Sequence, residues 1–434
     1  MSLTLVGIFG IAALLGVLFF LGMPVGFSMA MVGFLGFSQV INFNAGMSMA
    51  GSVFWSVASQ YGLTVIPLFI FMGQIAFYSG VNQRLYRAAH YWTGHIRGGL
   101  AMATIMACSA FAAICGSNTA TAATMSTVAL PEMRKYGYST ILSTGAIACG
   151  STLGVVIPPS VVLIILGLAT EQSIARLFYG GIGAGLILTL FFILSVRFVC
   201  RFFPAWGPVV EKKSLRARMA SLSGAGEMLL LFGLVMAGLW VGFFTPSEAG
   251  GAGAFFALVI AVAGKTLSFA NFKKAVLDTL RISCMVIMLI AGAMIFGRFL
   301  AVTRIPFDLA AWVAGLDFPS WAVMACICLI YILGGAIMDA LALLLITIPI
   351  FFPLAVQMGY DPVWFAVTIT VVTTLGAVTP PVGATTYVVT GVAGDIPLTD
   401  VFKGVFLFIP AYIITILLLI LFPSLVTFLP GLLG

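Results

Sequence analysis

The sequence predicts an all-α polytopic membrane protein that contains two inverted-topology repeats, each with a re-entrant helical hairpin and a broken helix. Three observations support this prediction. The chain is 62% hydrophobic and only 7% charged, which is more apolar surface than a soluble domain can bury. Two proline pairs interrupt apolar segments of membrane length, 222 residues apart (380 − 158). Loops at matched positions of the two halves differ in their charge.

The same unit occurs twice in the chain. Identical residues recur at the separation of 222 positions, namely Pro131 and Pro353, Gly137 and Gly359, Tyr138 and Tyr360, Thr152 and Thr374, Leu153 and Leu375, and Gly154 and Gly376, besides Pro158 and Pro380. A duplicated unit whose membrane helix breaks at the same internal point is typical of secondary transporters, where unwound backbone near the midplane forms the binding site.

Apolar runs fill nearly the whole chain. At about 20 residues per spanning helix, it divides into about ten crossings plus two segments that do not cross cleanly. The opening residues lack a basic segment and continue into a second helix, so they are interpreted as a first span rather than a cleaved signal. The expected organisation is N-terminal scaffold helices over 1–60, a first repeat over 61–203, linking scaffold helices and basic loops over 204–281, and a second repeat over 282–434.

Basic residues predict how the spans are oriented. The net charge of +7 comes from Lys and Arg at the ends of apolar runs, which orient membrane helices and do not indicate nucleic-acid binding. The basic segments 197–218 and 265–281 are predicted to be cytoplasmic, joined by two helices at 226–246 and 248–264. His90 and His95 are expected in a surface loop.

Matched loops then lie on opposite faces, because the first repeat carries only basic residues there and the second mostly acidic ones. These are Arg84, Arg87, Arg97, Arg134 and Lys135 in the first repeat, and Arg304, Asp308, Asp317 and Asp361 in the second. The repeats are therefore inverted, and both termini are expected to be periplasmic.

Two segments are predicted to be re-entrant hairpins. Residues 98–131 carry no charge and as a straight helix would measure about 50 Å, against a hydrocarbon core of about 30 Å. Because both flanks of this segment are basic, it is expected to enter, turn near Gly116–Thr119 and return. The matched region 318–356 predicts a second hairpin, which enters from the opposite side.

Each hairpin is followed by a predicted broken helix, at 141–171 and 363–393. Two consecutive prolines remove two amide donors and disfavour helix in the residue before them, which frees backbone carbonyls. Free carbonyls and hydroxyls in a dry environment suit a small hard cation. A simple kink is the alternative interpretation, but the recurrence of the break beside a polar hairpin turn favours a functional site.

Asp339 is an isolated charge in an apolar segment, with its nearest charged neighbours, Asp317 and Asp361, 22 positions away on either side. A lone carboxylate at membrane depth is costly and indicates a function. It could be a cation ligand, an acceptor from a substrate hydroxyl or a proton carrier. A hidden Arg partner or a shallow location is the alternative.

The position matched to Asp339 is Ser117, which precedes Asn118 and Thr119. Their hydroxyls and amide can coordinate Na⁺ or hydrogen-bond a carboxylate without adding net charge to the bilayer. Capping of the following helix is the alternative role. Arg298 and Arg304, near the predicted periplasmic end of a span, either reach the membrane interface or meet an anionic substrate or a partner protein.

Other classes of protein fit less well. No catalytic triad, phosphate-binding loop, HExxH motif or cofactor motif occurs in the sequence, and an intramembrane enzyme would need a paired nucleophile and base. An ion channel would need a continuous polar pore. The chain is therefore not expected to be an enzyme or a channel.

The paired motifs resemble those of the large membrane subunit of tripartite ATP-independent periplasmic (TRAP) transporters, over essentially the whole chain. The motifs are CGSNTATAATMSTVALPEM and GSTLGVVIPPS, with their second-half partners GGAIMDALALLLITIPIFFPLA and TTLGAVTPPVGATTYVV. The resemblance implies sodium-coupled import of an organic acid of the C4-dicarboxylate or sialic-acid class across a bacterial inner membrane. It also implies an elevator-type transport domain that moves against a scaffold.

The resemblance implies two protein partners, a periplasmic substrate-binding protein and a small four-helix membrane subunit. The small subunit is expected to be a separate chain, because the sequence contains no further four-helix segment. The alternative is a stand-alone sodium/carboxylate symporter of the same superfamily, which would need no binding protein.

Carried over by position, the resemblance implies two or more coupling sodium ions and a substrate between the hairpin tips. One sodium site would involve Ser117, Asn118, Gly150 and Gly154. The other would involve Gly335, Asp339, Thr374, Gly376 and Thr379. The substrate candidates are Asn118, Pro159, Asp339, Pro381, Arg298 and Arg304. The Ser117–Thr119 tip has no copy in the second half, so the ligands of the second sodium site are less well specified.

Overall fold

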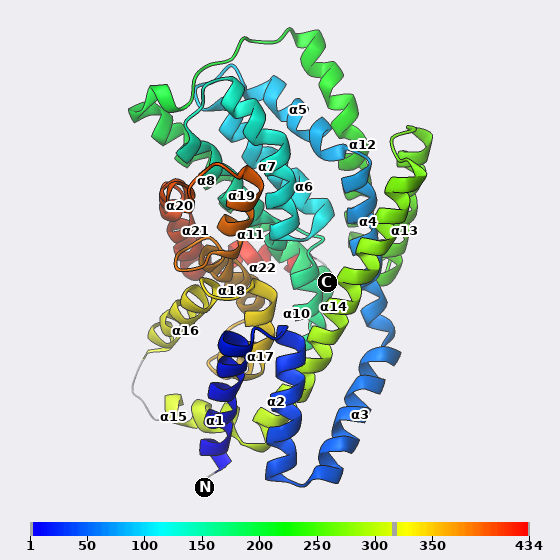
Figure 1. Cartoon of the computed structure of the whole chain (residues 1–434), viewed down its shortest axis with the longest axis vertical. Coiled ribbons are helices and arrows are strands. Elements are labelled where there is room, and N and C mark those ends of the chain that lie inside the picture. The colour runs from blue at the N-terminus through cyan, green and yellow to red at the C-terminus, as the bar shows by residue number, and fades with distance from the viewer. Residues whose placement is uncertain (1–2, 315–318, 433–434) are drawn as a thin grey trace.

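A computed structural model describes residues 3–314 and 319–432. Within these residues every regular element is a helix and no strand occurs (Figure 1). The all-α fold predicted from the composition is thus confirmed.

One group of helices lies along the long helix α14 (Phe269–Val302) and is called the α14 group. Its other members are α2 (Val25–Val40), α3 (Phe43–Ser59), α4 (Val65–Tyr78) and α13 (Pro246–Ala263). Helix α14 packs along α2 and α4. A Cβ atom on Gly26 would lie 2.9 Å from Leu289 Cα, and one on Gly33 would lie 2.7 Å from Phe296 Cα. These two glycines therefore let the α2 and α14 backbones meet directly.

The two repeats contain the same order of helices. The first hairpin is α6 (Gly99–Cys115) and α7 (Asn118–Lys135), followed by α8 (Thr140–Ser151), α9 (Leu153–Val156) and α10 (Val161–Ala169). The second hairpin is α16 (Ser320–Gly335) and α17 (Ala340–Gln357), followed by α18 (Pro362–Gly376) and α19 (Ala384–Ala393). Both proline pairs fall between helices, and both of their peptide bonds are cis. Asp317 and residue 318, where the second hairpin was predicted to start, lie outside the described residues.

The remaining helices connect and cover these parts. They are α1 (Leu3–Gly16) with a π-helical turn (Val17–Leu21), α5 (Val81–Thr93), α11 (Ile174–Phe202), α12 (Leu215–Trp240), α15 (Ile305–Ala314), α20 (Leu398–Phe406), α21 (Ile409–Leu421) and α22 (Ser424–Gly431), with 3₁₀ turns at Tyr61–Thr64 and Pro204–Trp206.

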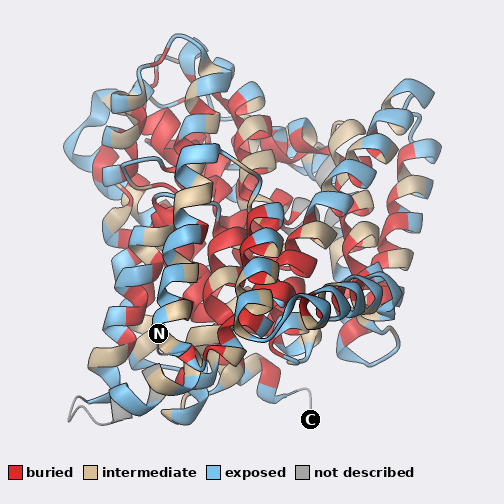
Figure 2. Ribbon diagram, turned by 60° about the horizontal axis from the view of Figure 1, so that its bottom comes forward, coloured by how far each residue is buried: buried red, intermediate tan, exposed pale blue. Residues whose placement is uncertain are grey.

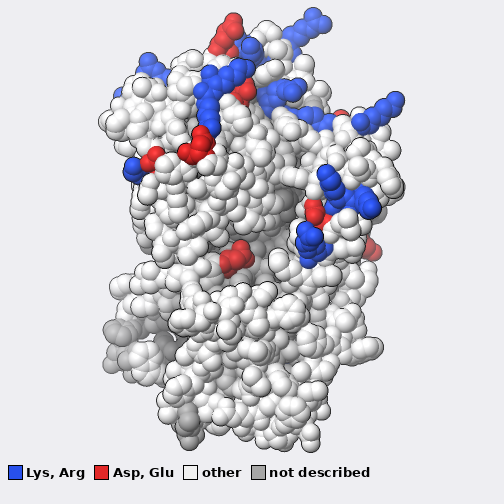
Figure 3. Space-filling view, viewed as in Figure 1, with Lys and Arg blue, Asp and Glu red and all other residues white. Residues whose placement is uncertain are grey.

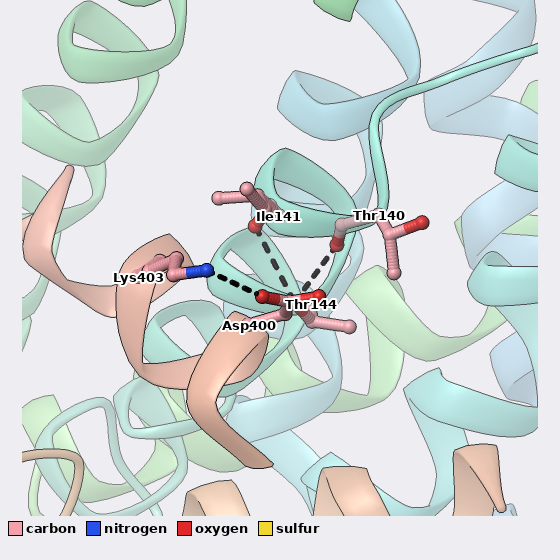
Figure 4. Close-up of polar contacts among 5 residues, drawn as sticks. All are labelled: Thr140, Ile141, Thr144, Asp400 and Lys403. Atoms are coloured by element: carbon pink, nitrogen blue, oxygen red, sulfur yellow. Dashed lines mark hydrogen bonds and ion pairs between the residues drawn. The ribbon is translucent and has the colours of Figure 1, made fainter. Parts of the chain in front are cut away.

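The two halves of the chain interlock. Helix α20 packs on α8 and α11 packs on α21 and α22. A Cβ atom on Gly145 of α8 would lie 2.8 Å from Gly404 Cα of α20. Near this crossing Lys403 Nζ lies 2.9 Å from Asp400 Oδ1, and the Thr144 hydroxyl donates to carbonyls of its own helix (Figure 4).

The buried core lies at the centre of the molecule (Figure 2). Residues 142–151 of α8 and 363–376 of α18 are buried without exception. Large apolar side chains on the outer helices are exposed, such as Phe54 and Trp55 of α3 and Phe255 of α13. Apolar residues on the outside as well as inside are what a lipid environment favours.

Fewer helices than predicted are long enough to span a membrane. Seven helices of the described chain qualify by length and composition, or eight if the bent pair α20 and α21 forms one span. The sequence predicted about ten because it could not show that several apolar runs form shorter helices. These are Val25–Val40, Gly99–Cys115, Ser320–Gly335, Pro362–Gly376 and Ala384–Ala393.

Helix α12 starts 11 residues before the predicted position 226, inside the basic segment. Its N-cap is Ser214, whose side chain accepts from Ala217 N. The Trp92 indole of α5 donates to the Arg218 carbonyl (3.3 Å), and the Arg218 guanidinium donates to His95 Nδ1 (3.1 Å). Packing of α12 on α5 therefore makes this basic segment helical.

His90 is not in a surface loop, so that prediction was wrong. It lies in α5, and its side chain is buried, with Nε2 lacking a hydrogen-bond partner. Tyr86 and Tyr136 contact its ring. Burial lowers the pKa of His90 below its usual value of 6.5. The negative charge of Glu132 opposes this lowering, and the positive charges of Lys213 and Lys135 add to it.

The variant Gly33→Ala should lower the thermal-unfolding midpoint in detergent. Its Cβ would lie 2.7 Å from Phe296 Cα, and overpacking of this kind costs about 1–3 kcal/mol. Gly51→Ala in α3 is the matched control, because nothing lies within 4 Å of its added carbon. Equal midpoints for the two variants would contradict the close crossing of α2 and α14.

His90 should make stability depend on pH. A base whose folded pKa is lowered binds fewer protons in the folded state, so stability falls as pH drops below about 6.5. The unfolding midpoint of the wild type should therefore fall more between pH about 7.5 and about 5.5 than that of His90→Gln. Identical slopes for wild type and His90→Gln would argue against a buried neutral His90.

Candidate functional site

The first hairpin turns at Gly116 and Ser117. Gly116 adopts the left-handed conformation (φ 62°), which suits glycine. Ser117 caps α7, its Oγ accepting a long hydrogen bond from Ala120 N (3.5 Å). Asn118 is only 7% exposed, and its Oδ1 has no hydrogen-bond partner. The capping alternative therefore holds for Ser117, while Asn118 keeps a free buried acceptor.

The second hairpin turns just before Asp339, which caps α17. Asp339 Oδ2 accepts from Leu341 N (3.0 Å). No ion pair of Asp339 occurs within residues 3–314 and 319–432, so a hidden Arg partner is not found there. In this turn the Ala336 carbonyl accepts from the amides of Val382 and Gly383 (3.0 and 3.1 Å).

Each hairpin turn lies against the helix break of its own repeat. A Cβ atom on Gly154 would lie 2.8 Å from the Ser117 carbonyl oxygen. In the second repeat, a Cβ atom on Gly335 would lie 2.8 Å from the Thr373 carbonyl oxygen and 3.1 Å from Gly376 Cα. Gly154 and Gly376 occupy matched positions, so both repeats use a glycine where the turn meets the break.

Both hairpin turns line a single cavity of about 490 Å³, here called the tip cavity. Ser117 and Asn118 reach it from the first turn and Asp339 from the second, while Gln74 of α4 and Met285 of α14 form the facing wall. The N-termini of α7 and α17 both lie at the tip cavity, and free amides at helix N-termini attract anions. Figure 3 shows an acidic side chain in a hollow at the middle of one otherwise uncharged region.

The predicted sodium-site residues lie close to the hairpin turns, except for Gly150. Thr374 donates to the Val371 carbonyl (2.6 Å) and Thr379 to the Gly376 carbonyl (3.0 Å), which leaves their hydroxyl lone pairs able to accept. Gly150 lies a turn before the break, where a Cβ atom would meet Cys108 Sγ of α6 at 3.2 Å.

The predicted substrate residues are only partly brought together. Pro159 is buried, and its carbonyl lies 3.0 Å from the position of a Cβ atom on Gly116. Pro381 is exposed. Arg298 donates to the Ser52 hydroxyl of α3 (3.2 Å), and Arg304 lies at the turn between α14 and α15. Neither arginine lines the tip cavity.

Sequence reasoning missed Gln74. It is the only amide side chain in the apolar helix α4 (VIPLFIFMGQIAFY), and it lies in the tip cavity opposite the hairpins. The occurrence of Gln74 within an apolar span could therefore have identified it as a candidate site residue.

The duplicated hairpins and helix breaks define a class of protein, the membrane transporters with internally repeated broken helices. The structure resembles the YdaH transporter of Alcanivorax borkumensis with a TM-score of 0.63, covering 89% of this chain and 87% of that one at 15% sequence identity. This likeness concerns the fold.

The family is shown by sequence comparison. Residues 12–425 match the family described as "Tripartite ATP-independent periplasmic transporter, DctM component". The chain is 32% identical to the C4-dicarboxylate TRAP transporter large permease protein DctM of Pseudomonas aeruginosa, over 88% of each chain. The chain belongs to this family of TRAP transporter large permeases, and it is a multi-pass membrane protein.

Two further relatives are named for substrates other than C4-dicarboxylates. The chain is 31% identical to the sialic acid TRAP transporter large permease protein SiaM of Vibrio cholerae, over 96% of each chain. It is 34% identical to the isethionate TRAP transporter permease protein DctMQ of Oleidesulfovibrio alaskensis, over 80% of this chain and 54% of that one.

The variant Gly154→Ala should reduce transport by about tenfold or more. Its Cβ would lie 2.8 Å from the Ser117 carbonyl oxygen, so the hairpin turn must move, and misplacement of a site by about 1 Å costs up to about 100-fold in enzymes. Uptake into proteoliposomes measures the effect, with size-exclusion chromatography as the folding check. Gly233→Ala in α12, where nothing lies within 4 Å, should retain uptake. Full activity of Gly154→Ala would show that the close contact is not needed.

Proposed function

We propose that this chain is the large permease of a sodium-coupled importer for an organic-acid anion of the C4-dicarboxylate or sialic-acid class. The observation that carries the proposal is that both hairpin turns line one tip cavity, where Asn118 Oδ1 is buried without a partner. Of the buried side-chain atoms that lack a partner among the described residues, Asn118 Oδ1 is the one at the tip cavity, so a ligand there would satisfy it. The names of the relatives supply the two substrate classes.

The tip cavity is the proposed substrate site. Its volume of about 490 Å³ lies in the range of small-molecule sites, about 300–1,000 Å³. The N-termini of α7 and α17 and the amides of Asn118 and Gln74 would donate to a carboxylate, and Asp339 would accept from a substrate hydroxyl. Pro159 and Pro381 would shape the site. Arg298 and Arg304, which lie away from the tip cavity, would meet the anion or a partner protein at another stage.

Sodium would bind where the turns meet the breaks. Carbonyls, hydroxyls and a carboxylate are the oxygen ligands that hard cations prefer. The first site would use Ser117, Asn118, Gly150 and Gly154, and the second Gly335, Asp339, Thr374, Gly376 and Thr379. In support, the Ser117 and Thr373 carbonyls already approach Gly154 and Gly335 closely. Bound sodium would offset the negative charge of Asp339 and substrate, so that the empty or fully loaded carrier moves most easily.

Movement would be of the elevator type, with the hairpins and broken helices of the two repeats sliding along the α14 group as scaffold. The scaffold would then include α4 and α14, which lie partly or wholly within the predicted repeat ranges 61–203 and 282–434. A second cavity of about 400 Å³ lies between α14, α10 and α17 and is lined by Ile290, Ala293 and Met294. The tip cavity adjoins an earlier stretch of α14, at Ile282, Met285 and Val286. These two cavities leave α14 loosely packed at two points along its length. This loose packing supports the proposal that the repeats slide along α14.

In the bacterial inner membrane the basic end would face the cytoplasm. Figure 3 shows Lys and Arg over the upper part of one face and as far down as its middle, whereas the described residues of its lower part show none. The Thr4 hydroxyl donates to Asp308 (2.7 Å), which supports an N-terminus on the side of that predicted periplasmic loop. The C-terminus would lie on the same side.

Two proteins would complete the transporter, a periplasmic substrate-binding protein and a small four-helix membrane subunit. In support, the DctMQ relative is longer than this chain, which covers only 54% of it. Uptake of labelled succinate or sialic acid into proteoliposomes tests the requirement for each component. Uptake that needs a sodium gradient and both partners supports the proposal, whereas uptake by this chain alone would support a stand-alone symporter.

The variants Asn118→Ala and Asp339→Ala should each lower sodium-dependent uptake by about 10- to 100-fold, because a charge-assisted hydrogen bond is worth about 1.5–3 kcal/mol. Asn118→Ala should also raise the sodium concentration needed for half-maximal uptake. Asn44→Ala, exposed on α3, is the matched control and should behave as the wild type. Intact sodium-dependent uptake in both tip variants would show that the site is assigned wrongly.

A further inference from the structure

An apolar groove of about 890 Å³ lies between α11 and α21, away from the tip cavity. Aromatic and aliphatic side chains form most of its wall, including Phe191, Phe198, Phe406, Pro410 and Ile414. Phe198, Phe406 and Ile414 are exposed. None of the groove residues lines the tip cavity, so this groove is a separate feature of the fold.

Two arginines occupy one end of the groove. Arg197 and Arg201 are one helical turn apart on α11, and both are exposed. Within the described residues neither forms an ion pair, whereas Arg84, Arg134, Lys213 and Lys403 each lie within 4 Å of an acid. The groove therefore presents two uncompensated cations beside an apolar surface.

The arginines mark the membrane-interface end of this groove. Helix α11 ends at Phe202, one residue after Arg201, and the 3₁₀ turn Pro204–Trp206 follows. Trp206 stacks on Phe203 (centroids 5.0 Å apart, 24° between planes), and Trp is enriched at membrane interfaces. The groove residues Phe191 and Leu194 lie earlier on α11, so the groove runs from this interface toward the hydrocarbon region.

We propose that this groove binds one anionic phospholipid of the cytoplasmic leaflet. The phosphate would lie between the Arg197 and Arg201 guanidinium groups, which pair bidentately with phosphate. An acyl chain would lie along Phe191, Phe198 and Ile414. Basic pockets between spanning helices on the cytoplasmic side are suited to acidic lipid headgroups. An apolar helix in the same groove would leave both cations without a counter-charge, which favours the lipid.

The test measures lipid binding to the purified full chain by native mass spectrometry, with dioleoyl phosphatidylglycerol and dioleoyl phosphatidylcholine as the two probes. One molecule of phosphatidylglycerol should bind more tightly than phosphatidylcholine. The double variant R197Q/R201Q should weaken that binding about 30-fold, since each basic residue near the surface contributes about 1 kcal/mol. R197K/R201K, which keeps both charges but cannot pair bidentately with phosphate, should lose less binding than R197Q/R201Q.

Matched variants separate this groove from general surface charge. K273Q/K274Q removes two exposed cations at the start of α14 and should leave phosphatidylglycerol binding unchanged. Ile414→Trp narrows the groove without changing charge and should weaken binding. Size-exclusion chromatography confirms that each variant is folded.

Three results would overturn the proposal. The first is equal affinity for the two lipids, and the second is equal loss in R197Q/R201Q and K273Q/K274Q. The third is displacement of the lipid by the co-purified small membrane subunit, with crosslinks from that subunit to Phe198 or Ile414, which would assign the groove to a helix.

Discussion

The structure depends on one constraint, that backbone polar groups inside a bilayer must find partners within the protein. A helix broken at a proline pair and the turn between the two helices of a hairpin each leave such groups free. Here the two defects satisfy each other. The Ala336 carbonyl of the second turn accepts from the Val382 and Gly383 amides just after the second break. At the first break, by contrast, the Ser160 hydroxyl donates to the Val155 carbonyl (2.7 Å), so this carbonyl is satisfied within the break itself. The side chain of Asn118 is left with an unused acceptor.

The two turns differ in charge although they occupy matched positions. The first presents Ser117 and Asn118, which are neutral, and the second presents Asp339 at the N-terminus of α17. A helix N-terminus stabilises a nearby negative charge, and the Asp339 carboxylate already caps the N-terminus of α17. An anionic substrate in the tip cavity would add a second charge beside Asp339. A bound cation would remove that repulsion, which gives a physical reason for coupling substrate to sodium in the proposed mechanism.

The sequence predicted the repeated part of the fold best, because proline and glycine act locally. The first hairpin and broken helix were predicted at 98–131 and 141–171, and the structure has them at 99–135 and 140–169. The agreement is close because the prolines and glycines that interrupt a helix can be identified in the sequence. Features created by packing between distant segments were missed. His90 is buried through its neighbours on α7, and Gln74 reaches the tip cavity only because α4 packs on α6 and α14. Arg298 and Arg304 lie within the predicted second repeat, 282–434, yet neither of them lines the tip cavity.

The distribution of packing separates the repeats from the α14 group. The repeats are joined to each other across the whole molecule, with α19 on α7, α20 on α8 and α18 on α11. The Thr152 and Tyr412 hydroxyls meet at 2.6 Å in the buried core, and Arg134 pairs with Asp395 at 2.6 Å between the first hairpin and the segment after the second broken helix. Both cavities beside α14 lie instead between the repeats and the α14 group. In the proposed elevator movement, cohesion within the repeats would let them move as one unit, and the voids at their border with α14 would reduce the close contacts that sliding disrupts.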